Sequence, residues 1–348
     1  MALKISFQAD PPIPYHTSSY HIKQGFNMKL FEPSIRNQEF NSILKSATYN
    51  LRSLLKVPKN FYVIYMNTSW FPLITLLSTN NQIATIDHSN QFSRLTNMIR
   101  LVTEESIHLN PIDPGYHGAI EALKDSAQVL MSDTDPSTGN FFRTNLIQSL
   151  KGLNPKLNLH VDISYSVPTN DFDYDTIDSF FFKTNIGFGI YQGPEVWLVK
   201  KNFFNLNKEK IERILDIQLF DRCEDTYCDQ NIDLIKIYAL GQIAADFNNR
   251  SLKIIKNETT YKSIIINSAI MNSNSFDLMI KNSDFQSKNI IAFTSGFSLD
   301  EMEKIFEKKG ILLDNITYKG SGSLIRIGNY PAHSKEQAEL LADIIQSI

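Results

Sequence analysis

The stretch IDSFFFKTNIGFG (177–189) carries an apolar run that ends at once in a charged residue, Lys183. Such a run predicts a buried strand, and the earlier LNLHVDISYS (157–166) predicts a second strand ending at Asp162. Burial at a strand end would favour the neutral, nucleophilic form of the Lys183 amine. A lysine so placed suits Schiff-base formation with a carbonyl cofactor, usually pyridoxal phosphate. Asp162 is then the candidate acid partner of the pyridine nitrogen.

A simpler interpretation exists for each of these two residues. A lysine before Asn-Ile-Gly is typical of the start of a solvated turn, and an aspartate after a strand is typical of a turn or a helix cap. Either residue alone favours this interpretation. Their order and their two strand contexts together favour chemistry.

Outward from this stretch, strands alternate with helical patterns, which predicts an α/β fold with a mostly parallel sheet covered by helices. The strands are expected at 61–65, 82–87, 127–131, 157–163, 179–183 and 195–200. The helices are expected at 37–56, 92–103, 207–217 and 230–247. A linker at 248–262 is expected to lead to a smaller α+β unit with strands 289–293 and 323–328 and helices 298–309 and 334–347. The predicted domains are therefore 1–250, with an irregular segment 1–25, and 251–348.

The composition excludes several classes of protein. The 348 residues carry a net charge of −3 and no basic run, which argues against nucleic-acid binding. No apolar stretch has the length of a membrane span, and the first residues show no apolar core of a secretory signal. Two cysteines make no disulfide framework, and no histidine or cysteine pattern predicts a metal site. We expect a cytoplasmic protein.

Three further motifs allow a functional and a structural interpretation each. Asn67–Trp70 in the sequence NTSW follows a strand and could hold a phosphate, or Thr68 and Ser69 could simply cap a helix. Phe92 could stack on a flat ring or belong to the core. Arg326, in the apolar strand GSLIRIGNY, could clamp a carboxylate or form a structural salt bridge.

These pieces occur in an order that resembles the phosphoserine aminotransferase family of fold type I pyridoxal phosphate enzymes. The similar segments are FQADPPIP (7–14), SIRNQEF (34–40), YVIYMNTSW (62–70), HSNQFSRLT (88–96), VDIS (161–164), FFKTNIGFGI (181–190), IYALG (237–241) and LIRIGNYPA (324–332). The resemblance covers nearly the whole chain. It implies a large domain with a mostly parallel seven-stranded sheet, a smaller C-terminal α+β domain, and a homodimer with shared active sites.

The resemblance also implies roles for individual residues. Lys183 would be the Schiff-base lysine, Asp162 the partner of the pyridine nitrogen and Phe92 the stacking ring. The other expected cofactor-binding residues are Thr68, Ser69, Trp70, Thr134 and Thr226. Asp225-Thr226 or Gln230-Asn231 would reach the cofactor phosphate of the neighbouring subunit. Arg326 would bind the substrate carboxylate, and Arg36 a second group of the substrate.

The chain departs from the family at the residues that grip the substrate phosphate. The first His-Arg pair is Ile35-Arg36 here, and the second aligns near Lys319-Gly320. Each lost charge-assisted hydrogen bond is worth about 1.5–3 kcal/mol. We therefore expect an aminotransferase that acts between an amino acid and an α-keto acid but has an altered substrate. A lyase or decarboxylase using the same cofactor, or a non-catalytic binding protein on this fold, remain alternatives.

Overall fold

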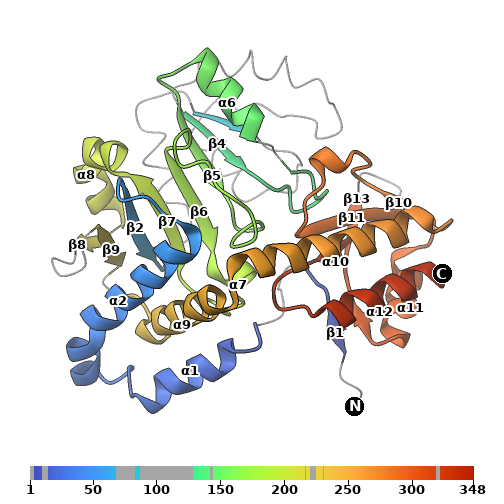
Figure 1. Ribbon diagram of the computed structural model, residues 1–348, viewed down its shortest axis with the longest axis horizontal. Coiled ribbons are helices and arrows are strands. Elements are labelled where there is room, and N and C mark those ends of the chain that lie inside the picture. Colours follow the sequence, from blue (N-terminus) through green and yellow to red (C-terminus); the bar gives the residue numbers. More distant parts are fainter. Residues whose placement is uncertain are drawn as a thin grey trace.

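The computed structural model describes residues 4–9, 15–67, 83–86, 128–141, 144–215, 217–219, 225–229, 231–318 and 322–348. Within these ranges, a large sheet covered by helices lies beside a smaller C-terminal unit built on its own sheet (Figure 1). This is the predicted α/β arrangement.

The described part of the large sheet has eight strands in the order β3-β4-β5-β6-β7-β2-β9-β8. They are β2 (Phe61–Met66), β3 (Ile83–Ile86), β4 (Gln128–Ser132), β5 (Asn158–Asp162), β6 (Ser179–Lys183), β7 (Glu195–Lys200), β8 (Ile217–Leu219) and β9 (Thr226–Asp229). β3 to β6 are parallel, and β2 and β9 run in the same direction as β6. β7 and β8 are antiparallel to their neighbours. The resemblance implies seven strands, and the described sheet has eight. The strands expected from the sequence do not include β8 and β9, which are only three and four residues long.

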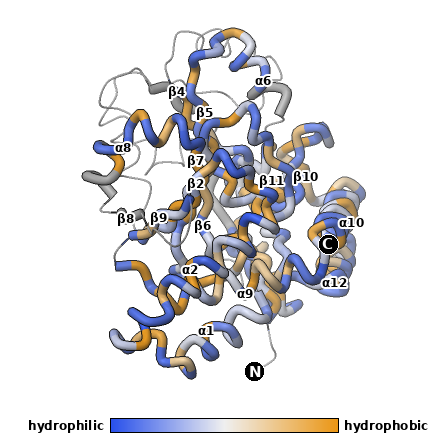
Figure 2. Tube along the Cα trace, turned by 60° about the vertical axis from the view of Figure 1, so that its left-hand side comes forward, coloured by the Kyte–Doolittle hydropathy of each residue, from blue (hydrophilic) through white to orange (hydrophobic). Residues whose placement is uncertain are grey.

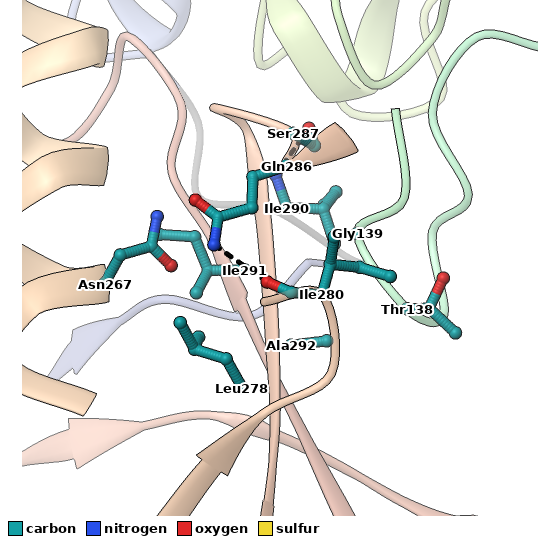
Figure 3. A pocket seen from close by; sticks show the side chains of 10 residues that line it. All are labelled: Thr138, Gly139, Asn267, Leu278, Ile280, Gln286, Ser287, Ile290, Ile291 and Ala292. Carbon is teal, nitrogen blue, oxygen red and sulfur yellow. Dashed lines mark hydrogen bonds between the residues drawn. The ribbon is translucent and has the colours of Figure 1, made fainter. Parts of the chain in front are cut away.

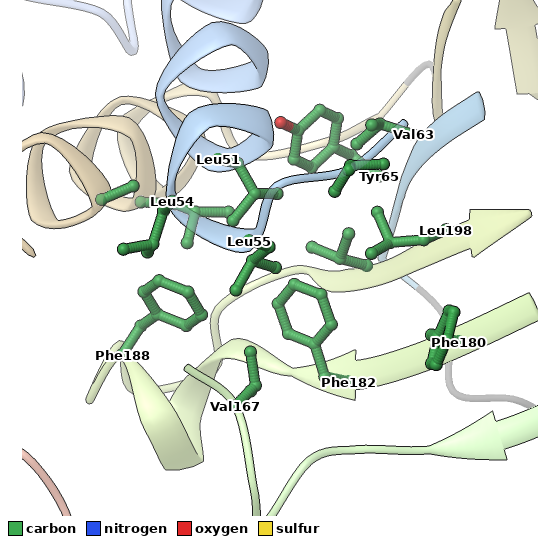
Figure 4. Packing of buried hydrophobic residues seen from close by; sticks show 14 of the residues in the cluster. Leu51, Leu54, Leu55, Val63, Tyr65, Val167, Phe180, Phe182, Phe188 and Leu198 are labelled. Atoms are coloured by element: carbon green, nitrogen blue, oxygen red, sulfur yellow. The ribbon is translucent and has the colours of Figure 1, made fainter. Parts of the chain in front are cut away.

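Side chains of the central strands alternate between two buried faces. Phe180 and Phe182 of β6 pack on the face covered by α2 and α9, whereas Phe181 packs on the face covered by α8. Figure 4 shows Phe182 below Leu55 of α2, and Phe180 farther along β6 below Leu198 of β7. A strand buried on both faces reads as a continuous apolar run, and for this reason the sequence predicts β6 and β7 with their observed bounds.

The described helices are α1 (Ser18–Asn27), α2 (Pro33–Leu55), α6 (Thr144–Leu153), α7 (Thr184–Gly187), α8 (Lys201–Leu215), α9 (Leu234–Arg250), α10 (Leu252–Asn272), η1 (Ser283–Phe285), α11 (Leu299–Lys308) and α12 (Lys335–Gln346). α2 and α9 lie against each other, with Gly241 of α9 facing Ala47 of α2. Among the described residues, none of these helices combines the length and the apolarity that a membrane crossing requires.

The C-terminal unit contains an antiparallel sheet in the order β10-β11-β14-β13. Its strands are β10 (Phe276–Leu278), β11 (Ile290–Ser295), β13 (Asp314–Tyr318) and β14 (Gly322–Gly328). α10, α11 and α12 contribute to the same hydrophobic cluster as β10, β11 and β14. Near the N-terminus, β1 (Ile5–Ser6) pairs in parallel with β12 (Ile311–Leu312), and Phe7 joins this cluster. The first described residues thus lie in the C-terminal unit, although the sequence groups them with the large domain.

Two expectations about local structure are wrong. The expected linker 248–262 is instead the end of α9 and the start of the long helix α10, separated at Ser251, whose φ is +70°. The sequence shows no continuous apolar stripe for α10, because the buried face of this helix includes the polar residues Thr259 and Lys262. The expected irregular segment 1–25 includes most of α1. The predicted domain boundary at 250/251 falls at the α9–α10 junction and remains a prediction.

Candidate active site

Three neighbouring parallel strands bring the predicted catalytic pair to one edge of the large sheet. Ser132 of β4 pairs with Asp162 of β5, and Asp162 pairs with Phe181 of β6. Lys183 is the last residue of β6. Asp162 and Lys183 therefore end adjacent strands, at the carboxyl edge where α/β proteins bind ligands.

Ser164 connects the ends of these two strands. Its backbone N–H donates to Asp162 Oδ1 over 2.8 Å, and its hydroxyl accepts from the backbone N–H of Lys183 over 3.0 Å. Ser164 is buried; its bond to Asp162 is fully buried and its bond to Lys183 partly buried, so water weakens the first bond little. The link holds the Asp162 carboxylate in a fixed position relative to the backbone that carries Lys183.

The Asp162 carboxylate has the character expected of a group that holds a cationic ligand. Burial raises the pKa of Asp162, while hydrogen bonds from Ser164 and the positive charge of Lys183 oppose the rise. A buried carboxylate is ordinarily paired with a cation, yet within the described ranges Ser164 is its only hydrogen-bond donor. The residues present therefore fit a ligand with a protonated ring nitrogen.

The Lys183 side chain is exposed, although the four residues before it in β6 are buried. The expected burial of the amine is therefore wrong for the single chain. Lys183 ends the strand and precedes the first turn of α7, where the sheet stops. Exposure leaves the amine accessible to a small molecule at this edge.

A second buried carboxylate, Asp133, lies beside Asp162. Its backbone N–H donates to the carbonyl oxygen of Asp162 over 2.9 Å, and the Ser166 hydroxyl donates to its Oδ2. Burial raises the pKa of Asp133 to about 7; Ser166 opposes the rise, and the nearby Asp162 charge adds to it. Thr134, a predicted cofactor contact, is buried next to Asp133. Its side chain lies close enough to oppose the rise in the pKa of Asp133, although its hydroxyl has no partner at regular hydrogen-bond geometry among the described residues.

The loop after β4 docks on the C-terminal sheet. Gly139, at φ +71°, lies so close to β11 that a Cβ atom there would be 2.4 Å from the carbonyl oxygen of Ile290. The Ser287 N–H donates to the Gly139 carbonyl over 2.8 Å. Gly139 and Ser287 are among the residues that line a cavity of about 10 Å³ (Figure 3), which has room for about one water molecule. The loop thus ties the carboxyl edge to the C-terminal unit.

Arg326 of β14 reaches the same loop. Its Nη1 donates to the Pro136 carbonyl over 3.0 Å, and its Nη2 contacts Asp314 Oδ2 at 3.1 Å. Its Nε is buried and has no hydrogen-bond partner among the described residues. The structural salt bridge that the sequence left open is therefore present, and the guanidinium keeps a donor for a further acceptor.

The carboxyl ends of β2 and β9 lie on the other side of β7. Glu195 of β7 pairs with Lys183 on one side and with Met66 on the other, so only β7 separates the end of β2 from Lys183. Asn67 Nδ2 donates to the Asn231 carbonyl over 2.7 Å. Asn231 therefore lies beside this edge, whereas Gln230 of the alternative Gln230-Asn231 pair lies outside the described residues.

Two predicted site residues, Arg36 and Thr226, lie near opposite ends of β9. Arg36 donates from Nη2 to the Ile232 carbonyl over 3.0 Å, just beyond Asn231. Thr226 pairs with Val63 inside the sheet, is fully buried, and lies 3.5 Å from the Thr48 hydroxyl. The structure therefore does not bring Thr226 to the carboxyl edge, because the register of β9 places it near the beginning of the strand.

Four predicted cofactor-binding residues lie outside the described residues. They are Thr68, Ser69, Trp70 and Phe92. Their roles remain predictions.

A separate pocket of about 840 Å³ lies between the end of α9 and residues 331–336. Its cations Arg250 and Lys335 both face Glu258, at 2.5 Å and 4.0 Å. Because these charges are already paired, the pocket shows no preference for one ligand class. The carboxyl edge is the better candidate site.

Sequence reasoning missed three residues of this region. Ser164 belongs to the quoted VDIS segment, but its bridging contacts depend on the β5–β6 pairing. Asp133 lies in the sequence SDTDPSTGN (132–140), which is typical of a loop, and its burial follows from the docking of that loop. Asp314 has no sequence signal, because its contact with Arg326 arises from the antiparallel register of β13 and β14.

The fold is that of the fold type I pyridoxal phosphate aminotransferases. Among solved structures, the chain is similar to a phosphoserine aminotransferase from Cytophaga hutchinsonii, with a TM-score of 0.86, 22% identity, and coverage of 100% of this chain and 99% of the other. It is also similar to the pyridoxal phosphate-bound phosphoserine aminotransferase from Trichomonas vaginalis, with a TM-score of 0.76, 15% identity, and coverage of 98% and 99%.

A third similar structure is a ureidoglycine–glyoxylate aminotransferase from Bacillus subtilis, with a TM-score of 0.77, 14% identity, and coverage of 100% and 93%. No protein-family model and no curated protein sequence matches the chain. The comparisons therefore define the fold over the whole chain and leave the substrate open.

Proposed function

We propose that the protein is a pyridoxal phosphate-dependent aminotransferase that moves an amino group between an amino acid and an α-keto acid, with a substrate other than phosphoserine. The observation that carries the proposal is the pair at the carboxyl edge. Asp162 is a buried carboxylate with no described cationic partner at hydrogen-bond distance, and Lys183 ends the next strand with an accessible amine.

The cofactor, when bound, supplies an electron-withdrawing ring that stabilises negative charge at the substrate Cα. Asp162 would hold the ring nitrogen in its protonated form. Lys183 would attach the cofactor covalently and, once released, would accept the proton from Cα and return one to the product. Ser164 would hold the Asp162 carboxylate in a fixed position relative to the backbone of Lys183.

The substrate would lie between this edge and the C-terminal unit. Arg326 would contact its carboxylate, since Nε is still available as a donor. Arg36 would contact the far end of the substrate across the subunit boundary of a homodimer. Only one residue of the first His-Arg pair remains, and this loss supports a substrate without a phosphate group.

A titration of the purified protein with pyridoxal phosphate tests the proposal. We expect saturable uptake with a change in the visible absorbance of the cofactor, and loss of that change in Lys183→Ala. The control is Lys281→Ala, which removes an exposed lysine that pairs with Asp277 on the surface. Unchanged absorbance in the wild type, or equal changes in wild type and Lys183→Ala, would overturn the proposal.

A further inference from the structure

Two buried acidic residues meet at the carboxyl edge, at the ends of adjacent strands. Asp133 directly follows β4, and its backbone N–H donates to the carbonyl oxygen of Asp162, the last residue of β5, over 2.9 Å. Only 7% of Asp133 and 5% of Asp162 are exposed. Like charges repel strongly where water is excluded, so the chain favours a state in which only one of the two carboxyl groups is ionised.

The two carboxyl groups differ in the partners that compensate a negative charge. Asp162 Oδ1 accepts the Ser164 N–H over 2.8 Å, and the positive charge of Lys183 acts on this group. Asp133 accepts from the Ser166 hydroxyl at Oδ2, whereas its Oδ1 is buried without a hydrogen-bond partner in the described ranges. The one described charge that acts on Asp133 is that of Asp162, which repels. A buried carboxyl group without a cation ordinarily stays neutral, so Asp133 is the member of the pair that keeps the proton.

A ligand that brings a protonated ring nitrogen to Asp162 changes this balance. Its positive charge offsets the repulsion between the two acidic residues and thereby favours ionisation of Asp133. Coupling between two binding events is reciprocal. Ionised Asp133 must therefore favour the bound ligand by the same factor.

We propose that Asp133 is a positioning residue that acts through Asp162: when ionised, it adds a second negative charge to the carboxyl edge and strengthens the binding of a protonated ring nitrogen. The inference rests on the proposed function, because it takes Asp162 to face that nitrogen. It makes the affinity for the cofactor pH-dependent. Binding is weaker while Asp133 is protonated and tightens as the pH rises through its pKa of about 7.

Pyridoxamine phosphate is the probe, because it contains the ring nitrogen and forms no Schiff base with Lys183. Calorimetric titration gives its dissociation constant at pH 6 and pH 8 for the wild type, Asp133→Asn and the exposed control Asp277→Asn. We expect the affinity of the wild type, relative to that of Asp133→Asn, to rise by at least about fivefold between the two pH values. This is the size expected when a nearby positive charge lowers the Asp133 pKa from about 7 to about 6. Asp277→Asn should follow the wild type at both.

Ser166→Ala is a second variant, which keeps Asp133 but removes the hydroxyl that donates to it. Because this donor favours the ionised carboxylate, its loss should move the rise in affinity to a higher pH, which a purely structural role of Asp133 would not predict. If Asp133→Asn does not fold, this shift decides the question, and an unshifted profile would overturn the inference.

The two proposals fail in different ways. Parallel pH profiles for the wild type and Asp133→Asn, with binding measurable in both, would overturn the role of Asp133 and leave the cofactor assignment intact. A wild type that does not bind pyridoxamine phosphate at either pH would overturn the proposed function, and this inference with it.

Discussion

At the scale of single residues, the carboxyl edge contains two buried carboxylates with different surroundings. Ser166 donates to Asp133, whose pKa is raised to about 7, and Ser164 donates to Asp162. A carboxyl group whose pKa is higher in the folded than in the unfolded state stabilises the protein at low pH. For Asp133 this contribution is present below pH 3.8 and is lost as the pH rises to about 7.

Asp133→Asn should therefore stabilise the protein at alkaline pH. We expect a gain in the free energy of unfolding of up to about 4 kcal/mol near pH 8 and a much smaller gain near pH 4, from the linkage of pKa to stability. Urea unfolding of wild type and variant at the two pH values measures it. The matched control is Asp277→Asn on the exposed surface, which should change little at either pH. An equal effect of Asp133→Asn at both pH values would contradict the account.

The sequence identifies Asp162 and Lys183 because each ends an apolar strand, a signal that is local in the chain. Asp314 and Thr226 illustrate the limit of such signals. The contact of Asp314 with Arg326 depends on the register of two strands, and so does the burial of Thr226 beside Val63. Register is fixed by pairing across the sheet, and one strand read alone does not contain it.

At the scale of elements, the crossing of α2 and α9 depends on a glycine. A Cβ atom at Gly241 would lie 2.8 Å from the Cα of Ala47, which is backbone and cannot rotate away. Gly241→Ala should destabilise the protein by about 1–3 kcal/mol, the usual cost of overpacking. Gly152→Ala is the control, since a Cβ atom there meets nothing within 4 Å in α6. It should be neutral or stabilise by up to about 1 kcal/mol, and thermal unfolding separates the two variants.

A buried polar ladder crosses three strands of the large sheet. His160 of β5 bonds to Ser179 at 2.6 Å and to Gln128 at 3.2 Å, and burial lowers the pKa of His160 to about 4. The unfolded chain therefore binds a proton at a higher pH than the folded one. The contribution is complete above pH 6.5 and is lost as the pH falls to about 4.

We expect the free energy of unfolding of His160→Gln to fall less between pH 6.5 and 4 than that of the wild type. The wild type should lose up to about 3 kcal/mol from this group between pH 6.5 and 4. The variant should be less stable at neutral pH but less sensitive to acid, whereas the exposed control His16→Gln should follow the wild type. Urea midpoints across this pH range measure the difference, and a variant as acid-sensitive as the wild type would count against a neutral buried His160.

Strand and helix positions were predictable to different degrees for a physical reason. β6 and β7 are apolar on both faces, so their runs stand out in the sequence. α10 buries only one face, and that face includes Lys262, whose Nζ donates to the Tyr330 and His333 carbonyls at 2.8 Å each. A helix that buries a charged residue through backbone acceptors looks like a polar linker when only its sequence is read.

At the scale of the whole molecule, exposed apolar side chains gather on α1 and the turn that leads to α2. Phe26, Met28 and Phe31 are 52%, 42% and 58% exposed, and the ring centroids of Phe26 and Phe31 are 6.0 Å apart. Figure 2 shows hydrophobic segments alternating with hydrophilic ones along α1 and its connection to α2, at the lower end of the molecule. Clustered exposed apolar residues mark interaction surfaces, and we expect this one to form part of the proposed homodimer interface.

Phe31→Glu should shift the protein from dimer toward monomer, because dimerisation would bury the introduced charge. Light scattering after gel filtration measures the mass. Leu206→Glu is the matched control, since Leu206 is 86% exposed on α8 and lies outside this stretch. A wild type that is monomeric at all concentrations, or a variant as dimeric as the wild type, would exclude this surface as the interface.

We propose that this fold holds pyridoxal phosphate on Lys183, beside Asp162. The most direct measurement is borohydride reduction of the protein with pyridoxal phosphate, followed by proteolysis and mass spectrometry of the peptides. We expect a stoichiometric phosphopyridoxyl label on the peptide that contains Lys183. Absence of label from that peptide, or label spread over surface lysines such as Lys281 and Lys4, would contradict it.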